Sequence, residues 1–420
     1  MKVIHIPRRF SATFWGGTET CILNLARAQQ ASGTDASIFT SQALCPTPAE
    51  TMQGVDVRRF TYQYPFLGLT PAQVNGFDQS GGNLLSLPLF KALLKTPDVG
   101  LLHAHTGKRL GGIIRTAARL KRIPYVITLH GGQFDIPTAI KDARQEQVPT
   151  GFEWGKIPGA LLGSRRVLDD AAAIFCVGRG EQRAVASRYP NKRVEYLPNG
   201  VDAARFSQTT DTDFRARHQI AAAAELLLCV GRIDPQKNQQ LLLQALAHLQ
   251  VSHPKAHLLL IGHVTDATYA SQLHLTIEKL NLAASVTLLP GLAPDNPELV
   301  AAYHAADLFC LPSIHEPFGI VILEAWTAGL PVLASKVGGI PGFTHDGEDI
   351  CHVSRAEAEL WARSIGALLD DPTRRQRLAG NGRQQVTACY DWHQVNRQVE
   401  TVYAEVTAAA SAKLQKKSQP

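Results

Sequence analysis

The sequence contains no long apolar run, no C-x-x-C pair and no Asn-x-Ser/Thr glycosylation site. Apolar segments such as Leu258–Ile261 are far too short to span a bilayer, and the first ten residues lack the apolar core of a signal peptide. The seven cysteines are scattered, which favours reduced, buried thiols over a disulfide framework. We therefore expect a cytoplasmic protein without a signal peptide or a transmembrane helix.

Length and charge suggest two parts with different partners. At 420 residues the chain is too long for one ordinary hydrophobic core, so we expect two domains. Residues 1–200 contain 24 Lys and Arg against 14 Asp and Glu, a balance of +10, and residues 201–420 contain 18 against 22, a balance of −4. The basic first half implies an anionic partner or surface on that side.

Segments typical of strands alternate with segments typical of helices, which predicts parallel sheets covered by helices on both faces. The expected strands of the first series are Lys2–Ile6, Ala36–Thr40, Gly100–His103, Tyr125–Leu129, Ala173–Val177 and Val194–Leu197. Those of the second series are Leu226–Val230, His257–Ile261, Ser285–Leu289, Leu308–Leu311 and Pro331–Ala334. The predicted fold class is α/β, with two Rossmann-like, doubly wound domains facing each other across a cleft.

The turn-rich segment Leu197–Asp202 marks the domain junction. We expect a first domain at 1–198 and a second at 203–390. A last helix over 391–412 would cross back onto the first domain, and 413–420 would be a disordered polar tail.

Two carboxylates, Glu316 and Glu324, lie eight residues apart around a Pro-Phe-Gly turn. If a helix starts at Gly319, the free N–H groups of Gly319 and Ile320 form an anion site. The carboxylates would then accept hydrogen bonds from sugar hydroxyls, a layout that suits a nucleotide-sugar. Two Glu on one helix face usually mean a solvated surface, but the intervening residues are almost all apolar, so both carboxylates need partners.

Arg232 and Lys237 flank a predicted strand-to-helix turn at the start of the second domain, with the helix expected near Gln236. Two cations at such a turn can converge on one diphosphate. Two surface cations near a turn would give the same pattern.

The first domain offers Gly16 and Gly17 after its first strand, where backbone amides can approach a ligand closely. An ordinary flexible turn explains this pair equally well. The segment lacks the G-x-G-x-x-G dinucleotide fingerprint. His130 ends another strand, and its place before Gly-Gly favours ligand contact over a structural role. His103 and His105 have metal-like spacing, but no nearby Cys or carboxylate completes a site, so we predict a structural role, or at most a place near the acceptor, and no metal site.

Arg115, Arg119 and Arg122, with Lys108 further upstream, fall on one face of a candidate helix. A solvated helix face is the usual explanation. The alternative is a patch that contacts anionic headgroups, which would make the protein peripheral at the inner face of the cytoplasmic membrane.

The chain resembles the retaining GT-B glycosyltransferases, glycosyltransferase family 4 in particular (glycosyl transferases group 1). The residues that carry the resemblance are Gly16-Gly17-Thr18-Glu19, His130-Gly131, Pro198-Asn199-Gly200-Val201-Asp202, Gly231-Arg232-x4-Lys237-Asn238, Pro312-Ser313-x2-Glu316-Pro317-Phe318-Gly319 through Glu324, Ala328-Gly329-Leu330-Pro331-Val332 and Gly338-Gly339-Ile340-Pro341. They span nearly the whole chain in the family order. They identify the class but not the substrates.

The resemblance implies a role for each matching residue. Arg232 and Lys237 would hold the diphosphate, Glu316 would bind a donor-sugar hydroxyl beside the amides of Phe318 and Gly319, and Glu324 would bind the ribose. His130 would contact the sugar, and Gly16 and Gly17 would line the phosphate and acceptor side. Loops near Gly262 and Pro290 would contact the base. Relatives often have Glu where this chain has Gly342.

The resemblance further implies a hexosyltransferase that retains anomeric configuration, without a metal ion or another cofactor and without a nucleic-acid partner. Its substrates would be a nucleotide-diphosphate sugar and a hydroxyl acceptor, anionic or lipid-linked, in polysaccharide or glycolipid synthesis. Glycosylation of a soluble sugar or sugar phosphate is the alternative, and an inactive GT-B binding module ranks last because Arg232, Lys237, Glu316 and Glu324 are all present. The insert between Gln133 and Pro158 is expected to shape the acceptor pocket.

Overall fold

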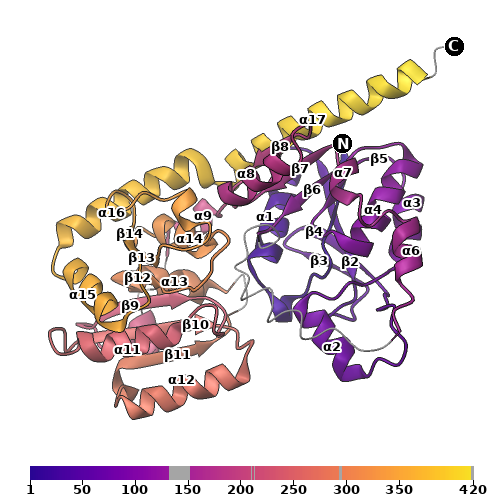
Figure 1. Cartoon of the computed structure of the whole chain (residues 1–420). Coiled ribbons are helices and arrows are strands. Elements are labelled where there is room, and N and C mark those ends of the chain that lie inside the picture. Colours follow the sequence, from indigo (N-terminus) through magenta and orange to yellow (C-terminus); the bar gives the residue numbers. More distant parts are fainter. Residues whose placement is uncertain (132–151, 210, 212, 293–295, 418–420) are drawn as a thin grey trace. The chain divides into compact units, whose positions relative to one another are not determined.

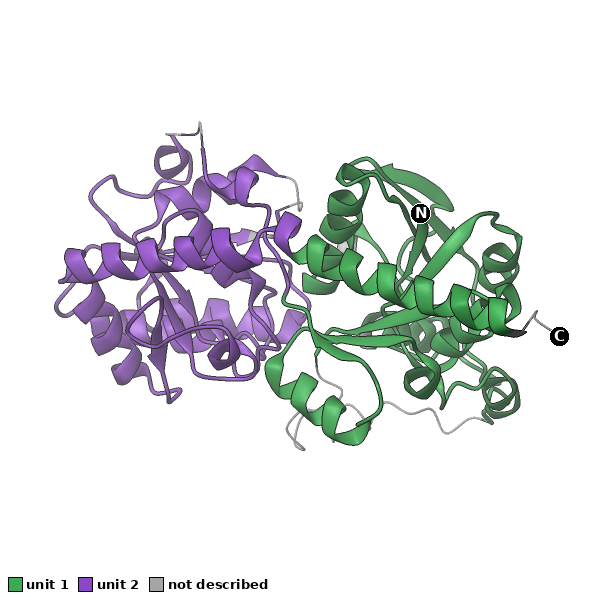
Figure 2. Cartoon of the chain, turned by 90° about the horizontal axis from the view of Figure 1, so that it is seen from above, with its two compact units in different colours: residues 1–198, 395–420 green, residues 199–394 purple. Residues whose placement is uncertain are grey.

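The computed structural model describes residues 1–131, 152–209, 211, 213–292 and 296–417. The chain divides into two compact units (Figure 2): unit 1 comprises 1–198 and 395–420, and unit 2 comprises 199–394. We expected the first domain to end at residue 198, the second to span 203–390 and the last helix to begin at 391. Most of the insert between Gln133 and Pro158 lies outside the described residues.

Unit 1 is built on an eight-stranded sheet among the described residues, in the order β3-β4-β2-β1-β5-β6-β7-β8 (Figure 1). All neighbouring strands are parallel except β3 and β4. The strands are β1 (Lys2–Ile6), β2 (Asp35–Ser41), β3 (Ala49–Met52), β4 (Val55–Phe60), β5 (Val99–Ala104), β6 (Tyr125–Leu129), β7 (Ala173–Cys176) and β8 (Val194–Tyr196). The six strands expected in this half of the chain are thus confirmed within one or two residues.

Two helices of unit 1, α2 and α3, begin at side-chain caps. Ser86 accepts a hydrogen bond from the amide of Leu89, and Thr70 forms a capping box with Gln73. The helices are α1 (Gly17–Ala31), α2 (Pro71–Ser80), α3 (Leu87–Lys95), α4 (Lys108–Lys121), α6 (Lys156–Leu161), α7 (Val167–Asp170) and α8 (Arg179–Arg188), with a 3-10 turn at Ala12–Phe14.

The two faces of the unit 1 sheet differ in polarity. Ile4 and Ile6 of β1 point into an apolar core with α3 and α4. The opposite face carries His5 and, in register on β5, His103, both fully buried. A buried polar layer therefore lies at the carboxyl ends of the central strands, under α1 and the last helix.

Unit 2 has a six-stranded, all-parallel sheet among its described residues, in the order β11-β10-β9-β12-β13-β14. Its strands are β9 (Glu225–Val230), β10 (Ala256–Gly262), β11 (Val286–Pro290), β12 (Leu308–Leu311), β13 (Val332–Ser335) and β14 (Cys351–Val353). Its helices are α9 (Ala203–Phe206), α10 (Phe214–Arg217), α11 (Gln239–Leu249), α12 (Ala267–Lys279), α13 (Pro297–Ala305), α14 (Ile320–Thr327), α15 (Ala358–Leu369) and α16 (Pro372–Gln385). 3-10 turns occupy Ala283–Ser285 and Ile340–Gly342, and a π-helix occupies Val386–Tyr390.

Strand β9 is buried on both faces. Leu226 and Leu228 join a core with α13 and α14, whereas Leu227 and Cys229 join a second core with α11, α12 and α15. This near-continuous apolar run is typical of a central parallel strand. Both units are therefore Rossmann-like α/β domains, as predicted.

The last helix, α17 (Trp392–Lys417), is longer than expected, because the segment predicted to be a polar tail is helical through Lys417. Its valines at 395, 399, 402 and 406 form a buried stripe at helical spacing. Asn396 Nδ2 donates a hydrogen bond to Ala28 O of α1 at 3.3 Å, and Arg193 pairs with Glu405. Figure 1 shows this helix running beside α8 and β8.

The predicted arginine stripe on α4 is wrong for Arg115. That side chain is 4% exposed, and its Nε donates to Asp170 Oδ2 at 2.6 Å. Arg119, Arg122 and Lys108, the first residue of the helix, are exposed. Arg115 points into unit 1 because it forms an ion pair there with Asp170. In the described part of the chain, no helix combines the length and the apolar composition needed to cross a membrane.

Candidate functional site

The loop after β12 in unit 2 holds a buried carboxylate beside a lysine. Glu316 is 7% exposed, and its Oε2 lies 2.5 Å from Lys237 Nζ. Ser313 Oγ donates to the same oxygen at 3.4 Å. The two residues come from loops 79 positions apart in sequence, after β9 and β12, which are neighbours in the sheet. The structure thus places the predicted Lys237 and Glu316 in direct contact.

Glycines position the backbone around Glu316. Gly319, the N-cap of α14, has a φ of 100°, a left-handed conformation that a side chain would strain. Gly339 N donates to Glu316 O at 2.8 Å, and a Cβ on Gly339 would lie 1.9 Å from Pro317 O. A Cβ on Gly338 would lie 2.1 Å from Glu316 O. The Gly-Gly turn after β13 therefore fits only without side chains.

Asp234 organises the cations of this site. Its Oδ1 accepts from the Lys237 amide at 3.1 Å, and its Oδ2 lies 3.0 Å from Arg232 Nη2. The helix expected near Gln236 begins at Gln239, so Arg232 and Lys237 both lie in the loop before it. The Arg232 side chain is 41% exposed and is available to a ligand from solvent.

Glu324 projects from the second turn of α14. Tyr303 Oη donates to its Oε2 at 2.7 Å. Burial raises the pKa of Glu324, opposed by the Tyr303 hydrogen bond and by the charge of Arg205. Phe318 stacks on Phe343 with ring centroids 4.4 Å apart, which anchors the turn and leaves the first-turn amides of Gly319 and Ile320 at a helix start.

Gly262 and Pro290 lie side by side, as partners in the register of β10 and β11. Gly291 N donates to Gly262 O at 3.0 Å. A Cβ on Gly262 would lie 1.8 Å from Gly231 O, so the ends of β9, β10 and β11 meet closely at this edge. The two positions predicted to contact a base are thus neighbours.

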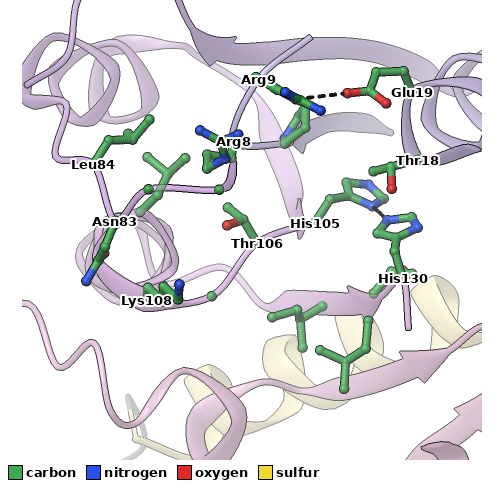
Figure 3. Close-up of a pocket in the computed structure, with 18 of the residues that line it drawn as sticks. Arg8, Arg9, Thr18, Glu19, Asn83, Leu84, His105, Thr106, Lys108 and His130 are labelled. Carbon is green, nitrogen blue, oxygen red and sulfur yellow. Dashed lines mark hydrogen bonds and ion pairs between the residues drawn. The ribbon is translucent and has the colours of Figure 1, made fainter. Parts of the chain in front are cut away.

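Unit 1 has its own pocket, of about 350 Å³, a size common for small-molecule sites (Figure 3). Cationic and polar side chains from several segments surround it. They are Arg8, Arg9, Thr18, Glu19, Asn83, His105, Thr106, Lys108 and His130. Gly16 is the N-cap of α1 and Gly17 is its first residue. The pocket is lined by the next two residues, Thr18 and Glu19, and not by these two glycines.

Arg8 and Arg9 line the pocket and also form hydrogen bonds within unit 1. Arg8 Nη2 donates to Asp78 O at 2.7 Å, and Arg9 Nη1 donates to the same carbonyl at 3.2 Å, near the C-terminus of α2. Arg9 also pairs with Glu19 at 3.6 Å. Burial lowers the pKa of Arg8, because a charge taken from water lacks full compensation. With Lys108, three cations face one carboxylate, so the pocket favours an anionic ligand.

His130 follows β6 and lines the pocket; its contact with a ligand stays a prediction. Its Nε2 lies 2.9 Å from His105 Nδ1, the bond drawn between the two rings in Figure 3. Burial lowers the pKa of His130 to about 4.

His5, His103 and His105 bring possible metal-ligand atoms within 4.8 Å of one another. Hydrogen bonds already occupy all six ring nitrogens. His103 contacts Tyr403 and Thr128, His5 contacts Gln29 and His105, and His105 also contacts His130. These bonds give the cluster a structural explanation, in line with the interpretation of the His-x-His spacing.

Several site residues escaped sequence reasoning. Asp234 lies inside the Arg-x4-Lys motif and could have been suspected from that position. Tyr303, Arg8 and Asn83 lie in segments without a motif, and only the fold brings them to their sites. Of the described part of the insert, Glu153 pairs with Arg109, and both lie outside the pocket lining.

Two family models match the chain. The model described as Glycosyl transferase 4-like domain matches residues 16–200, and the model described as Glycosyl transferases group 1 matches residues 210–385. These spans fall in unit 1 and unit 2 respectively, apart from two residues at the junction.

Similar proteins share most of the chain's length. The D-inositol 3-phosphate glycosyltransferase of Salinispora arenicola is 30% identical over 414 residues, which cover 94% of this chain and 88% of that protein. The glycogen synthase of Mycobacterium tuberculosis H37Rv is 26% identical over 419 residues, covering 96% and 94%. Among solved structures, Anabaena Alr3699/HepE in complex with UDP and glucose has a TM-score of 0.71 at 23% identity, covering 96% of this chain and 99% of that one.

Proposed function

The chain belongs to the group 1 glycosyltransferases, with the GT-B fold, and we propose that it transfers a hexose from a nucleotide-diphosphate sugar to a hydroxyl acceptor with retention of anomeric configuration. The observation that carries this proposal is the contact between Lys237 and Glu316 beside the N-terminus of α14. It combines a phosphate-binding cation, a sugar-binding carboxylate and a helix start in one unit.

We propose that unit 2 binds the donor. Lys237 Nζ has three N–H bonds, so while one is held by Glu316, two remain for diphosphate oxygens. Arg232, fixed by Asp234, adds a bidentate fork. Glu316 Oε1 would accept a sugar hydroxyl, and Glu324 Oε1 a ribose hydroxyl, since the recorded hydrogen bonds use Oε2 of each.

The reaction then needs positioning and charge stabilisation. The bond between the anomeric carbon and the phosphate oxygen breaks, the acceptor oxygen bonds to the same face, and a phosphate oxygen takes the acceptor proton. Arg232 and Lys237 stabilise the negative charge that grows on the diphosphate. We propose that no metal ion is required, because two cations at fixed positions supply that charge.

For the acceptor, the pocket of unit 1 supports a molecule with an anionic group. Its lining contains three cationic side chains, Arg8, Arg9 and Lys108, and one carboxylate, Glu19. A phosphate on a glycolipid or lipid-linked saccharide and a phosphate on a soluble sugar share this chemistry. Because Arg115 is buried, we do not propose membrane contact through Arg115, Arg119 and Arg122.

A sugar phosphate as acceptor is the second candidate. The name of the Salinispora relative, a D-inositol 3-phosphate glycosyltransferase, and the modest volume of the pocket favour it. Polymer or lipid-linked acceptors are favoured by the basic first half of the chain.

The test is a donor-cleavage assay over a panel of nucleotide-diphosphate sugars, with excess chelator, paired with phosphorylated sugars or with glycolipid vesicles. We expect one donor to release its nucleoside diphosphate in one acceptor arm, with the configuration of the sugar retained. Full activity in Glu316→Gln would contradict the assigned site, and loss of activity with chelator would contradict the metal-free reaction.

A further inference from the structure

A chain of hydrogen bonds runs through the buried layer of unit 1 to the pocket. Gln29 Oε1 lies 2.7 Å from His5 Nε2, His5 Nδ1 lies 3.0 Å from His105 Nε2, and His105 Nδ1 lies 2.9 Å from His130 Nε2. Gln29 and His5 are fully buried, and His105 is 8% exposed. This series of hydrogen bonds therefore connects Gln29 on the inner side of α1 with His130, which lines the pocket.

Each ring in this chain is neutral near pH 7. Burial lowers the pKa of His5 and of His130 to about 4, and that of His105 well below its ordinary value. A neutral imidazole carries one N–H and one lone pair. Because each N···N contact needs one of each, the tautomers of the three rings are coupled and must all point the same way.

Gln29 sets the direction. Its Nε2 lies 3.4 Å from Tyr403 Oη on α17, which turns Oε1 toward His5. A carbonyl oxygen only accepts, so His5 donates from Nε2 and accepts at Nδ1 from the Nε2–H of His105. His105 in turn accepts at Nδ1 from the Nε2–H of His130. The lone pair of His130 is then on Nδ1, which has no recorded partner within the described residues.

We propose that Gln29, His5 and His105 are positioning residues that hold His130 in its Nε2–H tautomer, so that His130 Nδ1 accepts a hydrogen bond from a hydroxyl of the bound substrate sugar. The substrate class rests on the proposed function, whereas the tautomer does not. If all three tautomers were reversed, His130 Nδ1 would carry the hydrogen and would act as a donor. A substrate hydroxyl could then only accept a hydrogen bond from this nitrogen.

A buried histidine of unit 2 offers a control. His257 on β10 is 8% exposed, and its Nε2 lies 2.8 Å from Thr287 Oγ1, outside the series from Gln29 to His130. His103 is unsuitable as a control, because its Nδ1 contacts the same Tyr403 Oη that holds Gln29. His257→Gln removes an equally buried histidine without touching the path from Gln29 to His130. Gln29→Leu removes the group that sets the direction, and His5→Gln cuts the path at the next position.

The first measurement is heteronuclear NMR of the histidine ring nitrogens in the full chain without substrate, with the His130 signals assigned by their loss in His130→Gln. We expect only the Nε2–H tautomer at His130 in the wild type and in His257→Gln, and a mixture in Gln29→Leu and His5→Gln. An Nδ1–H tautomer in the wild type, or a pure Nε2–H tautomer in folded Gln29→Leu, would overturn the proposal.

The second measurement is kinetic. With the donor identified, kcat/KM in Gln29→Leu should fall to about the fraction of molecules that keep the Nε2–H tautomer, and His257→Gln should stay near wild type. A tautomer mixture with unchanged kcat/KM would overturn the role in positioning. If the wild type cleaves no nucleotide sugar, the proposed function fails, while the NMR result still decides the tautomer.

Discussion

Lys237 Nζ and Glu316 Oε2 lie 2.5 Å apart, although their side chains come from loops on different strands of the unit 2 sheet. The side chains are only 13% and 9% exposed. A pair this buried is costly to desolvate, and removing one partner leaves the other charge uncompensated. Such a pair is more readily explained by a ligand-binding role than by stability alone.

Disruption of this pair should affect catalysis more than folding. Lys237→Ala and Glu316→Gln should each lower transfer by about 10²–10³-fold, since each removes a group aimed at the donor. In urea unfolding, the double variant should lose less stability than the sum of the single variants, by about 1–3 kcal/mol, because the two groups are in contact. Additive losses would show that the pair is not formed in solution.

The Gly-Gly turn behind Glu316 should be intolerant of a methyl group. Gly339→Ala puts a Cβ 1.9 Å from Pro317 O, so we expect the loop to shift and donor cleavage to fall at least tenfold. Gly380→Ala on α16 is the control, because nothing lies within 4 Å of its added Cβ. Equal activity of both variants, measured at matched folded fractions, would mean that the turn does not position Glu316.

The buried histidines of unit 1 should make its stability depend on pH. A folded pKa of about 4 for His5 and His130, below the ordinary 6.5, means that between these values the unfolded chain binds protons that the folded chain does not. Stability should therefore fall as the pH drops from about 6.5 toward 4, by up to about 3 kcal/mol for each histidine.

Urea unfolding of the full chain at about pH 7 and about pH 5 tests this slope. His5→Gln should weaken the pH dependence, whereas His274→Gln, at an exposed position on α12, should leave it unchanged. Identical slopes in the wild type and in His5→Gln would show that His5 is not held neutral by burial.

The three arginines of the predicted stripe should separate into one structural residue, Arg115, and two surface residues, Arg119 and Arg122. Arg115→Ala leaves Asp170 with only the exposed Arg166 as an ion-pair partner and should lower the stability by about 3 kcal/mol. Arg119→Ala should change it by less than about 0.5 kcal/mol, since the side chain is exposed. Thermal unfolding measures both, and equal effects would contradict the buried pairing.

The sequence was sufficient to predict the parallel sheets, because central strands such as Leu226–Val230 are apolar on both faces. It did not reveal the hairpin of β3 and β4. That edge pair is polar and exposed on β3, and its two-residue turn uses Gln53 and Gly54, both at positive φ, in place of the more common Asn-Gly.

The residues of the site could likewise be predicted only in part. Motif residues such as Lys237 and Glu316 follow strands at fixed spacing, so their convergence was predictable. The partners that orient them, Asp234 and Tyr303, depend on loop conformation and helix packing. Helical spacing alone placed Arg115 with Arg119, because periodicity does not show that Asp170 lies beside the first of them.

The most direct test of the donor site is the thermal midpoint of the full chain with each of a panel of nucleotide-diphosphate sugars and excess chelator, in the wild type and in Lys237→Ala. A ligand at about 100 times its Kd stabilises the folded state by about 2.7 kcal/mol, enough to raise the midpoint measurably. We predict a rise with one nucleotide sugar in the wild type and its loss in Lys237→Ala. No rise with any nucleotide sugar, or an equal rise in the variant, would contradict the assignment of unit 2 as the donor site.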